Sequence, residues 1–426
     1  MVQPLATLAV RGLSVLASFV ITWFLGRTLG PEANGQYALV TQTAMFLAVV
    51  AVGGLDLAIV RTMSRSVAAG VALSPVAVAR VGGYALVAFA IPLIVLLVGG
   101  TRLLEYAGVP AFALWMLVAL LASRIWTRVL SATLRSQGWY VVGQTVEVLA
   151  IPLIVCTALA ADLAGDVASI LWWTAVAGLA TGLIATGFTL SLTRRGADAM
   201  DVSMSEIRRV AAPLWGVAVA MSIADWYSLA TAARMLSVYD AGLFRVAWQL
   251  GSVFTIISSG LFGVYSVRIS TVYAKGDLAG VGRICRSATR LSVACVLPAA
   301  LILIVFAEQV LGFIGPQFVS AAPIVRVIAL GQAIYTVIGP AGIALAMTGH
   351  ERMNLRINLT SVVALLILAP LAALWGGLFG IATIIALLLV ARNAASVWAM
   401  HRYVGLNVVT GRVVGPGVRA SNSEKT

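Results

Sequence analysis

LGPEANGQYALV, residues 29–40, is a polar, turn-forming segment that lies between two long apolar runs near the start of the chain. Its outline returns at residues 236–247 as LSVYDAGLFRVA, which again separates two apolar runs. Gly242 follows Gly35 by 207 residues, and Phe244 follows Tyr37 by the same number. A turn that recurs at a constant offset indicates an internal repeat.

The composition of the chain excludes an ordinary soluble protein. The 426 residues are 61% hydrophobic and only 10% charged, with a mean hydropathy of +1.03, whereas charged residues make up about a quarter of soluble domains. The first apolar run extends to about residue 29 and lacks a small-residue cleavage site, so we expect a retained membrane helix. The three cysteines show no CxxC spacing, which argues against a disulfide framework or a thiolate metal site.

Runs of about 20 apolar residues predict the membrane-spanning helices. They lie at residues 5–29, 36–60, 81–101, 109–135, 139–161, 167–192, 210–235, 241–268, 287–310, 322–348, 354–375 and 377–401. These runs do not alternate every second residue, as the strands of a membrane barrel would. We therefore predict an all-α integral membrane protein with about 12 transmembrane helices.

The basic residues predict the orientation of these helices. Eighteen Lys and Arg residues fall in the C-terminal tail or in and around the connections after even-numbered helices, against five on the opposite side. The positive-inside rule then places both termini in the cytoplasm. The net charge of +13 reflects this topology and an anionic inner leaflet, so we do not expect a nucleic-acid partner.

The polar segment RRGADAMDVSMSEIRR, residues 194–209, divides the chain into two sets of six helices. We predict an N-terminal lobe at 1–193, a cytoplasmic linker at 194–209, a C-terminal lobe at 210–403 and a disordered cytoplasmic tail at 404–426. Further pairs at the 207-residue offset are Arg27 and Arg234, Gln42 and Gln249, Gly53 and Gly260, and Arg61 and Arg268. Because each half has an even number of helices, the repeats run parallel, and two lobes with a central cleft are the expected result.

Two segments resemble a known family. GRTLGPEANGQYALVTQ at residues 26–42, followed by GGLDLAIVR at 53–61, is similar to the start of polysaccharide-biosynthesis flippases of the O-antigen and capsule type. These belong to the multidrug/oligosaccharidyl-lipid/polysaccharide exporter superfamily. The resemblance implies that the chain moves a polyprenyl-(pyro)phosphate-linked oligosaccharide from the inner to the outer leaflet of a bacterial cytoplasmic membrane.

The resemblance also implies alternating access, driven by a H⁺ or Na⁺ gradient or by the membrane potential, with membrane lipids and polysaccharide polymerase machinery as partners. Three alternatives stay open. A cation-coupled multidrug exporter of the same superfamily would favour an acidic cleft, and a peptidoglycan-precursor flippase would typically carry two further helices. The third is a non-transporting membrane scaffold or enzyme.

Sequence motifs for catalysis are missing. Neither Lys275 nor Lys425 stands in a GxxxxGK[ST] loop, so ATP hydrolysis by this chain is not expected. The two histidines show no metal-binding spacing. No extramembrane segment is long enough for a catalytic domain. We expect a transporter without cofactor or metal rather than an enzyme.

The intramembrane charges are the candidate functional residues, because a lone charge in hydrocarbon costs ~2.5 kcal/mol or more. Counted from the neighbouring turns, Arg11 lies at the same depth as Asp56, and Arg128 at the same depth as Glu147. Each pair is predicted either to fix helix packing or to line the cleft. Arg124, one turn from Arg128, lacks such a partner and is predicted to contribute positive charge to a substrate path.

Asp225 differs from the shared scaffold, because its counterpart at the repeat offset is Ser18. A carboxylate near the membrane midplane suits coupling to H⁺ or Na⁺, although a packing hydrogen bond is the alternative. The predicted substrate-binding set is Arg124, Arg11, Arg128, Arg234, Arg245 and Gln249, and the predicted ion-coupling set is Asp225, Asp56 and Glu147. For Arg234 and Arg245, snorkelling to water is the simpler interpretation.

Overall fold

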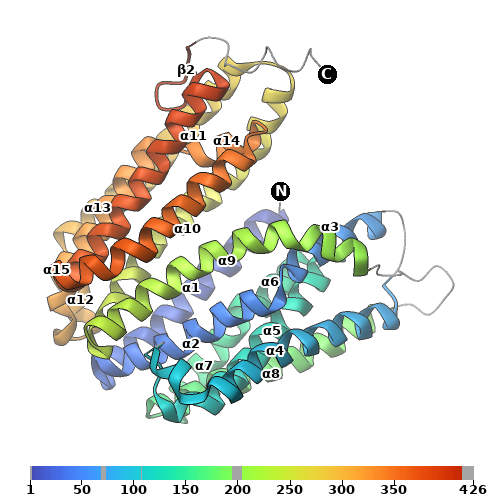
Figure 1. Ribbon diagram of the computed structural model, residues 1–426, viewed down its shortest axis with the longest axis vertical. Coiled ribbons are helices and arrows are strands. Elements are labelled where there is room, and N and C mark those ends of the chain that lie inside the picture. Colours follow the sequence, from blue (N-terminus) through green and yellow to red (C-terminus); the bar gives the residue numbers. More distant parts are fainter. Residues whose placement is uncertain (1, 69–72, 107, 194–203, 415–426) are drawn as a thin grey trace. The chain divides into compact units, whose positions relative to one another are not determined.

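The computed structural model of the chain describes residues 2–68, 73–106, 108–193 and 204–414 (Figure 1). The described chain forms two compact units, Met1–Gly242 and Leu243–Thr426. The first unit contains α1 (Val2–Thr28), α2 (Gly30–Val52), α3 (Leu55–Ala68), α4 (Pro75–Tyr106), α5 (Leu114–Ser136), α6 (Tyr140–Gln144), a π-helix (Thr145–Leu149), α7 (Ala150–Ala160), α8 (Val167–Ser191) and α9 (Met204–Met235).

α5 is the central helix of the first unit. It packs against α2, α3, α4, α6 and α8, and it buries Leu117, Leu120, Leu121 and Ile125 almost completely. A second apolar cluster joins α1, α7 and α8. Because five other helices surround α5, many of its polar residues lie between helices rather than on the outer surface of the unit.

Two helices of the first unit are irregular. Gly53 and Gly54 both adopt left-handed backbone angles, with φ of 61° and 76°, and they separate α2 from α3 within the predicted span 36–60. Such angles suit glycine, which has no Cβ to clash. The span 139–161 contains the π-helix Thr145–Leu149. Both irregularities change the direction in which the following side chains point.

The recurring turn of the sequence is a contact between the two repeats, made within the first unit. A Cβ added to Gly35 of α2 would lie 3.0 Å from the nitrogen of Gly242, and one added to Gly242 would lie 3.0 Å from the nitrogen of Gly35. The first would also meet the carbonyl oxygen of Val238, and the second that of Pro31. Val238 follows Pro31 by 207 residues, so equivalent backbone segments touch each other, and glycine recurs because no side chain fits.

The second unit is also helical. It contains α10 (Val238–Ala274), whose first turn belongs to the first unit, α11 (Leu278–Val305), α12 (Ala307–Ile314), a 3₁₀ turn (Pro316–Ala321), α13 (Ala322–Ile338), α14 (Ala341–Met347), α15 (Glu351–Ala399), a π-helix (Met400–Val404), and strands β1 (Leu406–Asn407) and β2 (Arg412–Val413). Gly339, with φ of 90°, separates α13 from α14. The side-chain amide of Asn393 donates to the carbonyl oxygens of Tyr335 and Gly339, 3.0 Å from each, and so satisfies backbone groups that the interruption releases.

α15 consists of two antiparallel halves. Gly377 has non-helical backbone angles, and Arg392 of the second half donates to the side-chain oxygen of Asn358 in the first half, at 3.3 Å. Residues 34 positions apart in one straight helix would be separated by about 50 Å. The chain therefore folds back at Gly377, as the predicted spans 354–375 and 377–401 require.

The predicted class, a membrane protein built of transmembrane helices, is confirmed. Ten helical spans in the described residues are long and apolar enough to cross a membrane, and the longest, Glu351–Val404, includes both halves of α15. The 32-residue α9 supplies the remaining predicted span, 210–235. α9 packs on α2 and α3 and belongs to the first compact unit. The lobe boundaries at 193 and 210 stay a prediction, and most of the linker lies outside the described residues.

One prediction for the C-terminus is corrected. Residues 405–414 are not a disordered tail, because β1 and β2 form a small antiparallel hairpin. Leu406 and Val408 are fully buried in a cluster with Val281 and Cys285 of α11, and the backbone of Gly411 lies against Gly282. Alternating apolar residues after the last helix give this segment enough buried surface to dock. Residues 415–426 lie outside the described part of the chain.

Candidate functional site

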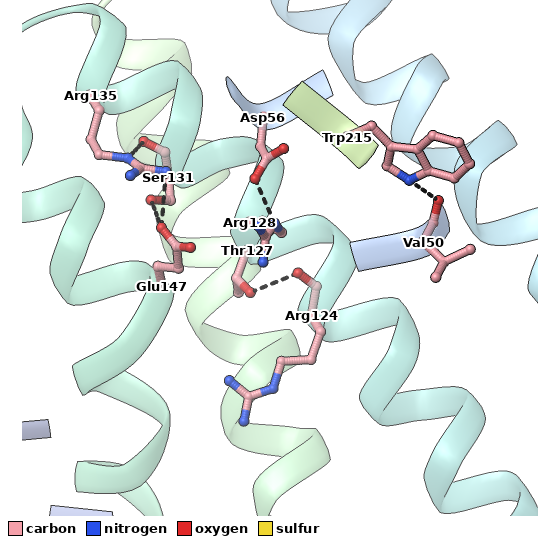
Figure 2. A network of polar contacts seen from close by, with 9 residues as sticks. All are labelled: Val50, Asp56, Arg124, Thr127, Arg128, Ser131, Arg135, Glu147 and Trp215. Atoms are coloured by element: carbon pink, nitrogen blue, oxygen red, sulfur yellow. Dashed lines mark hydrogen bonds and ion pairs between the residues drawn. The ribbon is translucent and has the colours of Figure 1, made fainter. Parts of the chain in front are cut away.

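A cluster of charged side chains surrounds α5 in the first unit (Figure 2). Arg124, Arg128 and Arg135 are spaced by four and seven residues, which places them on one face of the helix. Two carboxylates approach this face: Asp56 comes from the start of α3, and Glu147 comes from the π-helix. Three arginines and two carboxylates leave one positive charge in the cluster.

Asp56 neutralises Arg128. Nε of Arg128 donates to the Asp56 carboxylate at 2.6 Å, and only 4% of the Asp56 side chain is exposed. The predicted pairing of Asp56 with Arg11 is wrong. Two residues at equal depth lie at the same height in the membrane. Their side chains can still point in different directions around the two helix axes. The break at Gly53 and Gly54 turns Asp56 toward α5, whereas Arg11 lies on the exposed face of α1.

Glu147 pairs with Arg135 rather than with Arg128, so the second predicted pair is also wrong. Its carboxylate oxygen Oε2 lies 3.0 Å from the Arg135 guanidinium and accepts a hydrogen bond from the Ser131 hydroxyl at 2.8 Å. A π-turn places the side chains of its residues differently from an α-helix. The positive-inside rule predicts a cytoplasmic position for Arg135, one of the eighteen basic residues counted on that side. Only its seven-residue spacing from Arg128 could have indicated its place in the cluster.

Arg124 is the arginine of this cluster that has no ion pair among the described residues. It is half-buried, and its backbone carbonyl accepts a hydrogen bond from Thr127 at 3.4 Å. Its guanidinium interacts electrostatically with Tyr37 of the recurring turn and, more weakly, with Glu147. In Figure 2 the Arg124 side chain extends away from both ion pairs. The positive charge left over by the cluster therefore resides on Arg124.

The other predicted site residues are placed separately. Asp225 lies on an exposed face of α9, and Arg234 is exposed near the end of the same helix. In the second unit, Arg245 is half-buried and Gln249 is 5% exposed, both on α10. Their proposed roles in binding and coupling stay predictions.

Comparisons with known proteins agree with this architecture. A family model described as "Polysaccharide biosynthesis protein" matches residues 4–267, and the comparison with curated protein sequences gave no match. The structure is similar to an inward-facing multidrug resistance MATE family transporter of the MOP superfamily, which is the exporter superfamily introduced above. The TM-score is 0.76 at 15% sequence identity, covering 94% of this chain and 98% of that one.

Two further solved structures show the same fold. The lipid II flippase MurJ, in an inward closed conformation, gives a TM-score of 0.66 at 13% identity, covering 94% of this chain and 87% of that one. A MOP superfamily transporter from Pyrococcus furiosus, for which a reversed polarity of the binding pocket suggests a different function, gives 0.59 at 13% identity and 94% coverage of both chains. Proteins described as transporters and as a flippase thus share this architecture.

Proposed function

The chain belongs to the polysaccharide biosynthesis protein family, and from this premise we propose that it is a flippase for a lipid-linked glycan. Its substrate is a polyprenyl-(pyro)phosphate-linked oligosaccharide, which it moves from the cytoplasmic to the outer leaflet of a bacterial cytoplasmic membrane for surface polysaccharide synthesis. The MOP superfamily fold and the ten apolar helical spans of the described residues support a multi-pass transporter.

The observation that carries this proposal is the unpaired charge of Arg124. A pyrophosphate is anionic and strongly hydrated, so a path through the membrane must offer it cationic donors. Arginine suits this task because its planar guanidinium binds phosphate oxygens through two parallel hydrogen bonds. Asp56 and Glu147 are both occupied by arginines, so Arg124 retains a charge that attracts an anion.

The alternatives differ in the charge that they need. A multidrug exporter of cationic compounds needs a free carboxylate, and both carboxylates of this cluster are paired. This observation favours the flippase over the exporter. A peptidoglycan-precursor flippase also moves a pyrophosphate-linked lipid, so the charges of Arg124 and its neighbours fit it equally well. The identity of the transported glycan is what separates these two flippases.

The energy source is part of the proposal. The chain alternates between inward- and outward-open states, driven by a H⁺ or Na⁺ gradient or by the membrane potential, and Asp225 of α9 is the coupling candidate. Membrane lipids and polysaccharide polymerase machinery are the proposed partners.

Translocation in proteoliposomes tests the function. Purified protein is reconstituted with a fluorescent polyprenyl-pyrophosphate glycan, and an impermeant quencher reports its passage between leaflets. We expect translocation by the wild type, partial activity for Arg124→Lys, and loss of most activity for Arg124→Gln. Arg102→Gln is the matched control, because Arg102 is exposed on α4.

Two outcomes would change the assignment. Vesicles that expel a cationic dye but leave the glycan lipid in place would identify a multidrug exporter, and full activity of Arg124→Gln would remove Arg124 from the substrate path. In the same vesicles, an imposed proton or sodium gradient should accelerate the wild type. Asp225→Asn should abolish that acceleration if Asp225 is the coupling residue.

A further inference from the structure

The break between α2 and α3 is held by a tryptophan from α9. In an uninterrupted helix, the carbonyl of Val50 would accept the backbone N–H of residue 54. Gly53 and Gly54 end the helix there, and the indole N–H of Trp215 donates to the Val50 oxygen at 3.1 Å instead (Figure 2). Trp215 thus replaces a backbone hydrogen bond that the break removes.

α9 also touches the break with its backbone. A Cβ added to Gly54 would lie 3.0 Å from the Cβ of Trp215 and 3.1 Å from its nitrogen, and it would meet the carbonyl oxygen of Ala211. Glycine at position 54 therefore serves two purposes, the left-handed backbone angle and the close approach of α9. The conformation of the break and the position of α9 are mechanically linked.

The break determines where Asp56 points. α3 begins at Leu55, so the carboxylate lies on the second residue of the helix that the break reorients. In this structure it neutralises Arg128, which lies one helical turn from Arg124 on the same face of α5. A pyrophosphate carries more than one negative charge and would be held better by both arginines than by Arg124 alone.

We propose that Trp215 is a positioning residue that controls whether Arg128 is available to the substrate. This inference rests on the proposed function for the identity of the anion. While the Trp215 indole donates to the Val50 carbonyl, Asp56 neutralises Arg128. Arg124 is then the arginine of the cluster that can bind the anion. When α9 leaves the break, Gly53 and Gly54 allow α3 to turn, Asp56 withdraws, and Arg124 and Arg128 together bind the pyrophosphate. Movement of α9 thereby changes the affinity for the anionic headgroup.

Binding of inorganic pyrophosphate to the full chain in lipid nanodiscs, measured by calorimetry, tests the proposal without requiring transport. Trp215→Phe keeps an aromatic side chain but removes the N–H donor, so we expect pyrophosphate to bind a few-fold more tightly. Asp56→Asn removes the masking charge, and we expect a gain of about tenfold.

A second tryptophan supplies the matched control. The indole of Trp226, also on α9, donates to the Thr43 hydroxyl of α2 at 3.0 Å, in a regular part of both helices. Trp226→Phe removes an equivalent hydrogen bond and should leave pyrophosphate affinity unchanged. In an Arg128→Gln background, Trp215→Phe should give no gain, because the second cation is missing.

Three results would overturn the proposal: wild-type affinity in a well-folded Trp215→Phe protein, the same gain from Trp226→Phe, or a gain that persists in the Arg128→Gln background.

Failure of the proposed function would give a different set of results. If the variants show the expected affinities but the wild type moves no glycan lipid in vesicles, the switch stands and the substrate assignment fails. If glycan lipid is moved but Trp215→Phe leaves pyrophosphate affinity unchanged, the flippase stands and the switch fails.

Discussion

Arg128 and Asp56 form a buried ion pair, and each residue depends on the presence of the other. Removing two charges from water is costly, and their mutual attraction in the interior offsets that cost only if the geometry is good. The 2.6 Å distance between Nε and the carboxylate meets this condition. The loss of either partner would leave an isolated charge among helices, which is far more costly than the loss of a surface pair.

We therefore expect Arg128→Ala to lower the free energy of unfolding by ~3–5 kcal/mol, measured by denaturant unfolding in detergent micelles. Arg283→Ala is the comparison, because the Arg283–Asp277 pair is largely exposed, at 65% and 46%, and such pairs are worth ~0–1 kcal/mol. Exchanging the two residues, Arg128→Asp with Asp56→Arg, should restore part of the stability. Unchanged stability with lost translocation would show instead that Arg128 serves the substrate path and not the packing.

At the scale of the element, the helices were predictable and their interruptions were not. The hydropathy summed over a window of about 20 residues does not depend on the backbone angles within that window. The span 36–60 was therefore predicted, but the break that it contains at Gly53 and Gly54 was not. The same sum does not detect the π-helix around Glu147. These two features set the directions of Asp56 and Glu147, which is why the sequence identified both carboxylates, Arg124 and Arg128 but assigned wrong partners to the carboxylates and missed Arg135.

The crossing of α2 and α10 provides a prediction for whole elements. Gly35→Ala and Gly242→Ala each place a methyl group against the backbone of the other helix, and we expect each to lower the unfolding free energy by ~1–3 kcal/mol. The double variant should cost less than the sum of the two single variants, because one displacement of the helices relieves both clashes.

Gly83→Ala in α4 is the control for these variants, since nothing lies within 4 Å of a Cβ added there. It should be neutral or slightly stabilising, because alanine favours helix over glycine. Thermal unfolding of the four purified proteins gives the comparison. Equal stability of Gly35→Ala and Gly83→Ala would mean that the crossing relaxes at no cost.

At the scale of the whole molecule, composition and the distribution of charge carry the most information. Hydropathy and the 207-residue offset predicted a many-helix membrane protein with internal repeats, and the fold agrees. The hairpin at 406–413 was missed because each strand has only two residues, which is too short for a periodic pattern. The substrate class came from a resemblance in residues 26–61, since no physical property of the helices specifies a glycan.

The topology of the molecule is a prediction that labelling can test. With Cys156, Cys285 and Cys295 replaced by serine, single cysteines are introduced in both termini, in the 194–209 segment and in the 29–36 turn. An impermeant maleimide should label only the last of these from outside intact cells, because the positive-inside rule places the others in the cytoplasm. External labelling of the 194–209 segment would refute the arrangement of two six-helix halves.

Gly35 and Gly242 touch at equivalent positions of parallel repeats, which is the contact that a symmetric dimer makes with itself across its twofold axis. An ancestor of half this length, acting as a homodimer, would have placed one glycine against its own copy, so a single mutation would have introduced two clashing side chains at once. Duplication and fusion of such a gene would give each position its own codon without removing the constraint. Descendants of the fused gene should therefore keep or lose the two glycines together, and a side chain gained at one position should be accompanied by a compensating change at the other.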